Sequence, residues 1–158
     1  LVVNMNPRNH LEKAIKINPD FSEAYFELGL LEKLEGNKND ALKLFKKAVS
    51  INKNFAEAEC ELAIILMNSD ELEESRDHFL NSLEINPNYA DAYFNYGILL
   101  TKLHDIEEAK NNFDKVTEID QNYSKAYFHK AKLLTHPDDF ESARKNYETA
   151  IDIDDSFV

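Results

Sequence analysis

Apolar residues recur along the chain at three- and four-residue steps, the spacing that places side chains on one face of an α-helix. In the stretch from Ser22 to about Glu35 these positions are Ala24, Tyr25, Leu28 and Leu31. From about Asn39 to Ser50 they are Ala41, Leu42, Phe45, Ala48 and Val49. Gly36 stands between the two stretches and can end the first helix in a left-handed conformation. Because the connection is short, the two helices are predicted to be antiparallel.

This two-helix pattern repeats every 34 residues without an insertion. Four columns illustrate the period: Phe21, Phe55, Tyr89, Tyr123 and Phe157; Ala24, Ala58, Ala92 and Ala126; Ile17, Ile51, Ile85, Ile119 and Ile153; and Leu11, Phe45, Phe79, Phe113 and Tyr147. With 11% aromatic residues, five aromatics in one column would arise by chance with a probability on the order of 10⁻⁵. We predict nine helices, the first over about 7–17 with Asn6 as its cap and Pro7 in its opening turn, followed by four hairpins.

Polar and small residues also keep the period. A column of candidate N-cap residues contains Asp20, Asn54, Asn88, Asn122 and Ser156. Glu23 and Glu57 follow three residues later and are expected to complete capping boxes. Small residues should let the helices of a hairpin approach closely, with large aromatics filling the remaining space: Gly29, Ala63, Gly97 and Ala131 are the small ones. One hairpin cannot bury both of its faces, so the core is predicted to continue through stacked neighbours.

The pattern resembles the tetratricopeptide repeat. Residues 22–55 match its signature at Tyr25, Leu28, Gly29, Ala41, Phe45 and Ala48, and residues 90–123 match at Tyr93, Tyr96, Gly97, Ala109 and Phe113. The resemblance implies an all-α, right-handed superhelical solenoid of antiparallel helix hairpins. It implies a single array over 1–158, with the second helix of a partial repeat in 1–21 and full repeats at 22–55, 56–89, 90–123 and 124–157. Four departures should weaken local packing: Glu32, Ser75, Ser82 and Lys130.

The resemblance further implies that the first helix of each repeat lines a concave groove, where such arrays bind peptides or proteins. The predicted groove residues are Phe26, Leu30, Ile64, Phe94, Asn95, Ile98, Lys125, Phe128, His129 and Lys132. A second interpretation stays open, in which the aromatic members only pack helix against helix. Glu23, Glu27, Glu57 and Glu61 make the N-terminal part acidic. Binding at the basic C-terminal part is expected to tighten as His129 protonates near pH 6.5, the usual pKa of histidine.

Some tetratricopeptide domains hold a ligand's terminal carboxylate with Lys, Asn and Arg side chains from three successive repeats. Asn95, Lys125 and His129 match three of the five positions, with His in place of Arg. Cys60 and Ile64 stand where Lys and Asn are needed. The sequence therefore argues against such a clamp.

Composition narrows the classes of partner. The net charge of −12 would repel nucleic acid, and residues 56–89 hold nine acidic residues against Arg76 alone, for −8. The apolar runs are too short for a transmembrane helix, so no membrane insertion is expected. A single cysteine, Cys60, excludes an intrachain disulfide and a cysteine-based zinc site. It slightly favours a reducing compartment such as the cytoplasm, and leaves the compartment otherwise open.

The sequence offers no catalytic chemistry. It has no glycine-rich phosphate loop and no convincing triad, and only His129 and His136 share a face among its histidines, which is a weak metal site. We therefore predict no enzyme activity, no metal and no cofactor. The predicted function is a scaffold that binds a peptide or partner protein, of unknown identity, in the groove. The alternative is an assembly or self-association segment of a larger tetratricopeptide protein whose activity lies elsewhere.

The ends of the array carry a separate expectation. The chain begins inside a repeat and stops where a next helix should start, so the array is expected to be incomplete or self-associating. The last hairpin should expose the outer side of its apolar stripe, including Tyr147 and Ile151. Copies of the chain are then expected to associate through these end faces.

Overall fold

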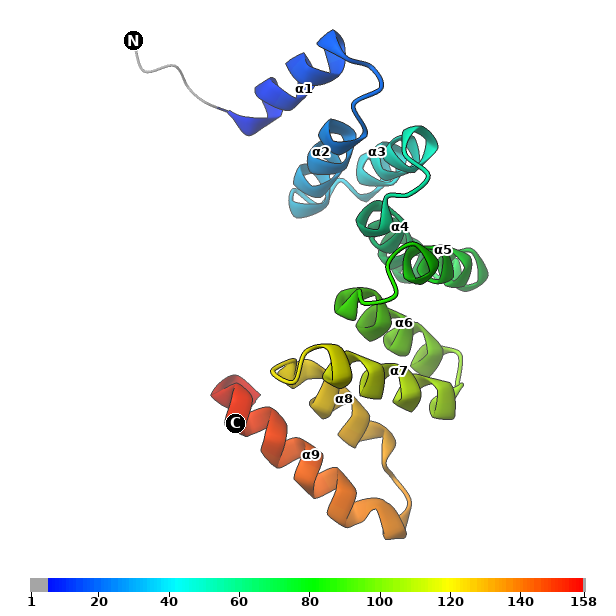
Figure 1. Cartoon of the computed structure of the whole chain (residues 1–158), viewed down its shortest axis with the longest axis vertical. Helices are drawn as coiled ribbons and strands as arrows, with labels where there is room; N and C mark the ends of the chain where they lie inside the picture. Colours follow the sequence, from blue (N-terminus) through cyan, green and yellow to red (C-terminus); the bar gives the residue numbers. More distant parts are fainter. Residues whose placement is uncertain (1–5, 158) are drawn as a thin grey trace. The chain divides into compact units, whose positions relative to one another are not determined.

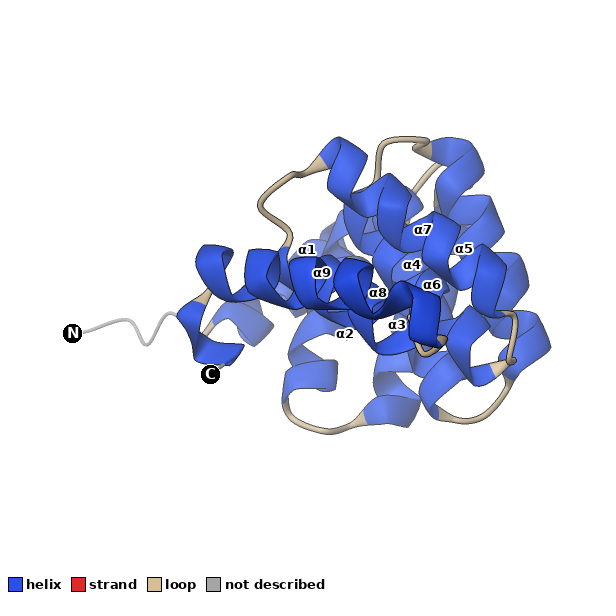
Figure 2. Ribbon diagram, turned by 90° about the horizontal axis from the view of Figure 1, so that it is seen from below, coloured by secondary structure: helices blue, strands red, loops and turns tan. Residues whose placement is uncertain are grey.

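The computed structural model describes residues 6–157, and within this range every regular element is a helix (Figures 1 and 2). The chain forms two compact units, one ending at Ile85 and the other beginning at Asn86. The nine α-helices between residues 6 and 157 confirm the predicted number.

Unit 1 contains one single helix and two helical hairpins. Its helices are α1 (Pro7–Ile17), α2 (Ser22–Leu34), α3 (Lys38–Ile51), α4 (Ala56–Asn68) and α5 (Leu72–Ile85). The start of α1 confirms the prediction, because the side chain of Asn6 accepts a hydrogen bond of 3.1 Å from the backbone N–H of Arg8 and Pro7 opens the helix. The α2–α3 and α4–α5 pairs are the hairpins, joined by short connections.

Unit 2 contains two hairpins, of which the second is irregular. Its elements are α6 (Ala90–Lys102), α7 (Ile106–Ile119), α8 (Ser124–Leu133), the 3₁₀ turn η1 (Pro137–Asp139), α9 (Phe140–Ile153) and the 3₁₀ turn η2 (Asp155–Phe157). α8 has 10 residues, whereas α2, α4 and α6 each have 13. Pro137 follows the shortened helix and opens η1, since proline fits the first turn of a helix but cannot continue a preceding one.

The cores of the α2–α3, α4–α5 and α6–α7 hairpins are each built around one phenylalanine. Phe45, Phe79 and Phe113 are 0% exposed. Two glycines of the opposing helices give the ring its space: a Cβ atom added to Gly29 would lie 2.7 Å from Phe45 Cε1, and one added to Gly97 would lie 2.8 Å from Phe113 Cε1. The small-residue columns therefore set how closely the two helices of a hairpin can pack.

The last hairpin partly departs from the expectation for its outer side. Ile151 is 38% exposed, as predicted. Tyr147 is only half-buried rather than exposed, because its ring packs 5.6 Å from the ring of Phe128. The exposed apolar residue that the sequence analysis did not select is Phe140, at 65% exposure.

The first helix of three hairpins ends in the same backbone arrangement. Gly36 has a φ of 84°, as expected for a left-handed helix end, and the equivalent residues Asp70 and His104 have φ values of 65° and 62°. In each case the next residue's N–H bonds back to the carbonyl five residues before it, as from Asn37 to Glu32 at 2.8 Å. These hydrogen bonds satisfy carbonyls at the end of each helix that the helix itself leaves unpaired.

We expect His104→Gly to raise the free energy of unfolding by about 0.5–1 kcal/mol. A left-handed conformation costs a residue with a Cβ about 1–2 kcal/mol, and glycine's greater freedom in the unfolded chain offsets part of the gain. Urea-induced unfolding followed by circular dichroism measures the change. The reciprocal control is Gly36→Ala, which should lower the free energy of unfolding. Equal stability for both variants and the parent would contradict the assigned strain.

The predicted N-cap column is wrong. The N-caps of α2, α4, α6 and α8 lie one residue after the predicted column, at Phe21, Phe55, Tyr89 and Tyr123, and none of these residues makes a side-chain cap hydrogen bond. The capping boxes of Glu23 and Glu57 therefore do not form. The turn is instead stabilised by the residue two positions before each predicted cap. The side-chain oxygen of this residue accepts a hydrogen bond from the backbone N–H two residues on, at 2.9–3.1 Å. The five residues are Asn18, Asn52, Asn86, Asp120 and Asp154. Asx turns of this kind suit residues that end one helix before another begins.

The buried serines do not simply weaken packing, as the sequence suggested. Ser75 and Ser82 are 0% exposed, and their hydroxyls donate to the carbonyls of Ala63 and Ala56, both at 2.8 Å. Each bond joins α5 to α4. A buried hydroxyl with a partner contributes to the hairpin instead of leaving an unsatisfied polar group.

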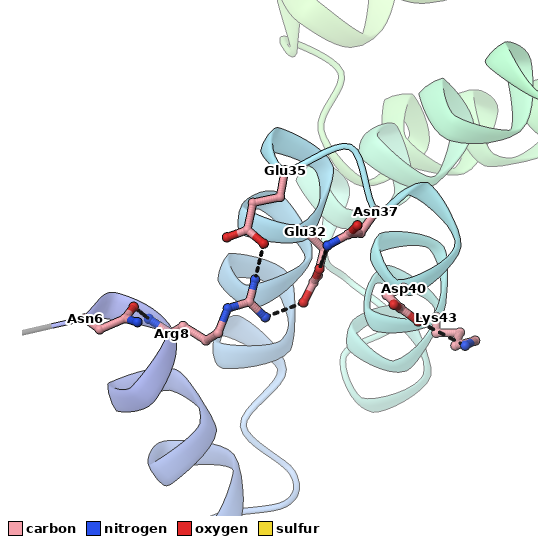
Figure 3. Close-up of polar contacts among 7 residues, drawn as sticks. All are labelled: Asn6, Arg8, Glu32, Glu35, Asn37, Asp40 and Lys43. Atoms are coloured by element: carbon pink, nitrogen blue, oxygen red, sulfur yellow. Dashed lines mark hydrogen bonds and ion pairs between the residues drawn. The ribbon is translucent and has the colours of Figure 1, made fainter.

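Glu32 and Lys130 are also compensated. Arg8 of α1 bonds to the carboxylates of Glu32 and Glu35, and Asn37 donates to Glu32 Oε2 at 2.7 Å (Figure 3). The hydrogen bond from Arg8 and then that from Asn37 lower the pKa of Glu32 below its usual value. Lys130 of α8 forms an ion pair with Asp114 of α7. Residues that depart from the apolar pattern thus join neighbouring helices through polar contacts.

Candidate functional site

Three of the predicted groove residues lie in unit 1, and all three are half-buried: Phe26 and Leu30 on α2, and Ile64 on α4. The ring of Phe26 lies 4.8 Å from that of Phe55 and 5.7 Å from that of Phe45. Phe26 and Leu30 both pack against the buried cluster that includes Phe45 and Leu62. In unit 1 the aromatic groove position therefore has a packing role as well as a partly accessible side chain.

The polar surroundings of these residues differ from the sequence pattern. Cys60, the equivalent of Phe26 in the next repeat, is 1% exposed and belongs to the core. Glu61 of α4 pairs with Lys33 of α2 at 2.5 Å. Glu23, Glu27 and Glu57 remain exposed carboxylates. One of the four expected negative charges is therefore neutralised by a lysine that the sequence analysis did not consider.

Unit 2 brings most of its predicted groove residues together on α6 and α8. The ring of His129 lies 5.3 Å from that of Phe94, edge-on at 85°, and 5.8 Å from that of Phe128. Lys132 Nζ lies 5.7 Å from the centre of the Phe128 ring, within range of a cation–π interaction. All three rings are half-buried, whereas Lys132 is exposed. The arrangement is a partly accessible aromatic surface with a lysine at its edge.

His129 does not titrate where the sequence analysis placed it. Burial lowers the pKa of His129 below its usual value of 6.5, and the positive charges of Lys132 and then Lys125 lower it further. His129 therefore protonates at a lower pH than expected, and any tightening of binding on its protonation is expected at that lower pH. The positive charge of this part of unit 2 comes from the exposed lysines Lys125 and Lys132 instead.

Asn95 and Ile98 complete the predicted set on α6. The side-chain amide of Asn95 donates to the carbonyl of Asp91 at 2.8 Å, one turn earlier in the same helix. Ile98 is half-buried and follows Phe94 by one turn, on the same helical face. Asn95 is thus partly engaged by its own helix, while Ile98 extends the apolar part of the surface.

Two tyrosines extend the aromatic surface and were not among the predicted groove residues. The ring of Tyr123 lies 5.1 Å from that of Phe94, and its hydroxyl donates to Asp91 Oδ1 at 2.7 Å. Tyr147 packs against Phe128. Both belong to aromatic columns of the repeat, which could have identified them. We use the term aromatic surface for Phe94, Tyr123, Phe128, His129 and Tyr147.

Two further structural findings bear on function. Within residues 6–157 no group of three or more His, Cys, Asp or Glu side chains could hold a metal ion. Over the same part of the chain, no helix combines the length and the apolar character needed to cross a lipid bilayer.

Comparison with known protein families gives three matches along the chain. Profiles described as tetratricopeptide repeat match residues 10–43, 78–111 and 124–157, which together are more than half of the chain. The first two windows begin 68 residues apart, twice the period of the sequence pattern. No curated protein sequence matches the chain significantly. The boundaries of the individual repeats remain a prediction.

Solved structures show the same fold at low sequence identity. A crystal structure of MamA is 23% identical, with a TM-score of 0.82 over 94% of this chain and 87% of that one. MamA from Desulfovibrio magneticus is 16% identical, with a TM-score of 0.79 over 94% and 84% of the two chains. PilF of Pseudomonas aeruginosa is 21% identical, with a TM-score of 0.83 over 90% and 65%.

The comparisons agree with the architecture of each unit. Helical hairpins with small residues facing a central phenylalanine recur at a 34-residue period in the sequence, and the two windows of one family profile keep this period. The fold is an all-α solenoid of such hairpins. The chain therefore belongs to the tetratricopeptide repeat family and is, in general terms, a protein-interaction scaffold.

Proposed function

We propose that the chain binds a peptide or a segment of a partner protein through the predicted groove residues, without catalysing a reaction. The observation that carries the proposal is the aromatic surface of unit 2. Half-buried rings supply apolar area at a small cost in conformational entropy, and such rings are enriched among the residues that dominate binding.

The charges beside the aromatic surface indicate the type of segment. Lys125 and Lys132 are exposed and lie close enough to His129 to lower its pKa. A ligand with an apolar anchor residue flanked by acidic residues would place its anchor on the rings and its carboxylates beside the lysines. The anchor would supply most of the affinity, and the charges would set orientation and association rate.

The first experiment is a selection of displayed peptides against the purified chain. We expect the enriched peptides to share an aromatic or aliphatic anchor with nearby Asp or Glu, and to bind unit 2. The double variant Lys125→Glu/Lys132→Glu should weaken binding about tenfold, mainly through slower association and less so at high salt. Lys145→Glu, an exposed lysine of α9, is the control for a change in net charge and should have little effect.

Phe94→Ala tests the anchor in the same assay and should cost about 1–3 kcal/mol of binding free energy. Because Phe94 also packs against Phe113, unfolding curves must confirm that the variant stays folded at the assay temperature. If folded Phe94→Ala and the double lysine variant both bind like the parent, the partner binds elsewhere and the aromatic surface is only core.

Assembly with copies of the same chain is the alternative role. Exposed Ile151 and Phe140 on α9 favour it, whereas the half-buried Tyr147 does not. Light scattering of the parent protein, before any peptide is added, separates the two roles. A concentration-dependent increase in mass would support assembly, and a constant monomer mass would count against it.

A further inference from the structure

Unit 1 has a surface depression that includes none of the predicted groove residues. It has a volume of about 990 Å³ and lies between the C-terminal part of α3 and one face of α5, with Glu59 of α4 in its lining. Val49 and Ile85 supply apolar parts of the wall, and the remaining lining is polar. The proposed peptide-binding role does not use this depression.

Of the two buried acidic residues in the described part of unit 1, Glu32 and Glu59, only Glu59 lines this depression. Its side chain is 7% exposed, and its Oε2 lies 2.5 Å from Nδ1 of His78, which is also part of the lining. A carboxylate accepts hydrogen bonds only, so His78 is the donor of this pair. The bond orients the carboxylate and leaves its second oxygen for another donor.

The second oxygen of Glu59 has no hydrogen-bond partner among residues 6–157. It is also not sealed in the interior, since the only sealed, unpaired side-chain polar atom in the described part of the chain is Arg76 Nε. Glu59 is one of the residues that line the depression. A carboxylate oxygen in such a partly desolvated position binds a charged donor more strongly than one in open solvent.

The rest of the lining favours a flat cation with several N–H groups. The side chains of Asn81 and Glu84, one turn apart on α5, offer further acceptor oxygens. A guanidinium carries five N–H donors in one plane and is more weakly hydrated than an ammonium, so it loses less on entering a half-buried site. The aliphatic part of an arginine could lie against Val49 and Ile85. The surplus of acidic residues in 56–89 attracts such a group, and the single lysine of the lining, Lys53, is exposed.

We propose that this depression binds an arginine side chain of a partner protein, with its guanidinium on the carboxylate of Glu59 and its stem against Val49 and Ile85. His78 positions the carboxylate and does not contact the arginine's charge directly. The site is independent of the aromatic surface, so unit 1 and unit 2 can each engage a segment of different chemistry.

The test titrates the whole chain with N-acetyl-arginine methylamide and follows backbone amide resonances by NMR at pH 7. The neutral analogue N-acetyl-citrulline methylamide has the same shape without the charge, and the lysine analogue has the charge without the planar donors. We expect saturable shifts around His78 and Asn81 with the arginine compound, weaker binding with the lysine compound, and none with citrulline at the same concentrations. Glu59→Gln should weaken arginine binding at least about tenfold.

Glu57→Gln is the matched control, because Glu57 is an exposed carboxylate two residues away on the same helix. It should leave binding unchanged. If Glu59→Gln does not fold, Glu84→Gln on the exposed rim replaces it and should weaken binding several-fold. Equal binding of arginine and citrulline, equal binding of arginine and lysine, or an equal loss in Glu57→Gln would each overturn the proposal. None of these outcomes depends on the aromatic surface.

Discussion

Phe113→Ala should lower the free energy of unfolding by about 3–5 kcal/mol, the largest effect that we expect from a single substitution in this chain. Phe113 is 0% exposed, and its ring lies 5.8 Å from both Phe94 and His129. Truncation removes apolar contact area and leaves a cavity that rigid helices can only partly close. Urea-induced unfolding followed by far-UV circular dichroism measures the loss.

Phe140→Ala is the matched control for Phe113→Ala. Phe140 is 65% exposed on α9 in the same unit, so its removal should change stability by no more than about 0.5 kcal/mol. A loss below about 1 kcal/mol for Phe113→Ala would contradict the description of this ring as the centre of the α6–α7 hairpin. Since the aromatic surface rests on Phe113 through Phe94, the same variant should also perturb that surface.

Gly97→Ala should lower the free energy of unfolding by about 1–2 kcal/mol, although alanine is the better helix former. Helix propensity alone would stabilise α6 by about 1 kcal/mol. Against this, the new Cβ would lie 2.8, 3.0 and 3.2 Å from three ring atoms of Phe113. That ring is fully buried and cannot swing away, and overpacking of this kind costs about 1–3 kcal/mol.

A second background separates helix propensity from overpacking at Gly97, because the effect of Gly97→Ala on the free energy of unfolding should change sign there. In a Phe113→Leu background the ring atoms that meet the new Cβ are absent, so Gly97→Ala should become neutral or stabilise by up to about 1 kcal/mol. The four proteins of this cycle are compared by chemical denaturation under identical conditions. If Gly97→Ala has the same effect in both backgrounds, the glycine is not required by the Phe113 ring.

The helices were predictable because their apolar spacing recurs in every repeat, but the ends of the helices were only partly so. Gly36 signalled a left-handed helix end, whereas Asp70 and His104 adopt the same conformation without a glycine to reveal it. At the other end, Asn18 and Asp20 are both plausible turn residues by type. Only the backbone shows that Asn18 holds the turn and that the helix begins after Asp20.

The repeat columns indicated which residues lie on the first helices, but the sequence did not indicate which side chains form pairs. The repeat placed Phe94, Phe128 and His129 on the first helices, and the structure finds them in contact within unit 2. The pairing of Lys33 with Glu61 joins side chains 28 residues apart, and that of Glu59 with His78 joins side chains 19 apart. Such contacts depend on how neighbouring helices pack. The same packing determines the burial that lowers the pKa of His129.

The attachment of α1 has a consequence for how unit 1 opens. α1 has no fully buried residue, and ion pairs from Arg8 to Glu32 and Glu35 join it to α2. An element without a fully buried residue can separate at a small fraction of the free energy needed to open the core of α2 to α5. Unit 1 therefore contains two levels of cooperativity, an inner four-helix foldon and an outer helix whose docking equilibrium is tuned by ionic strength.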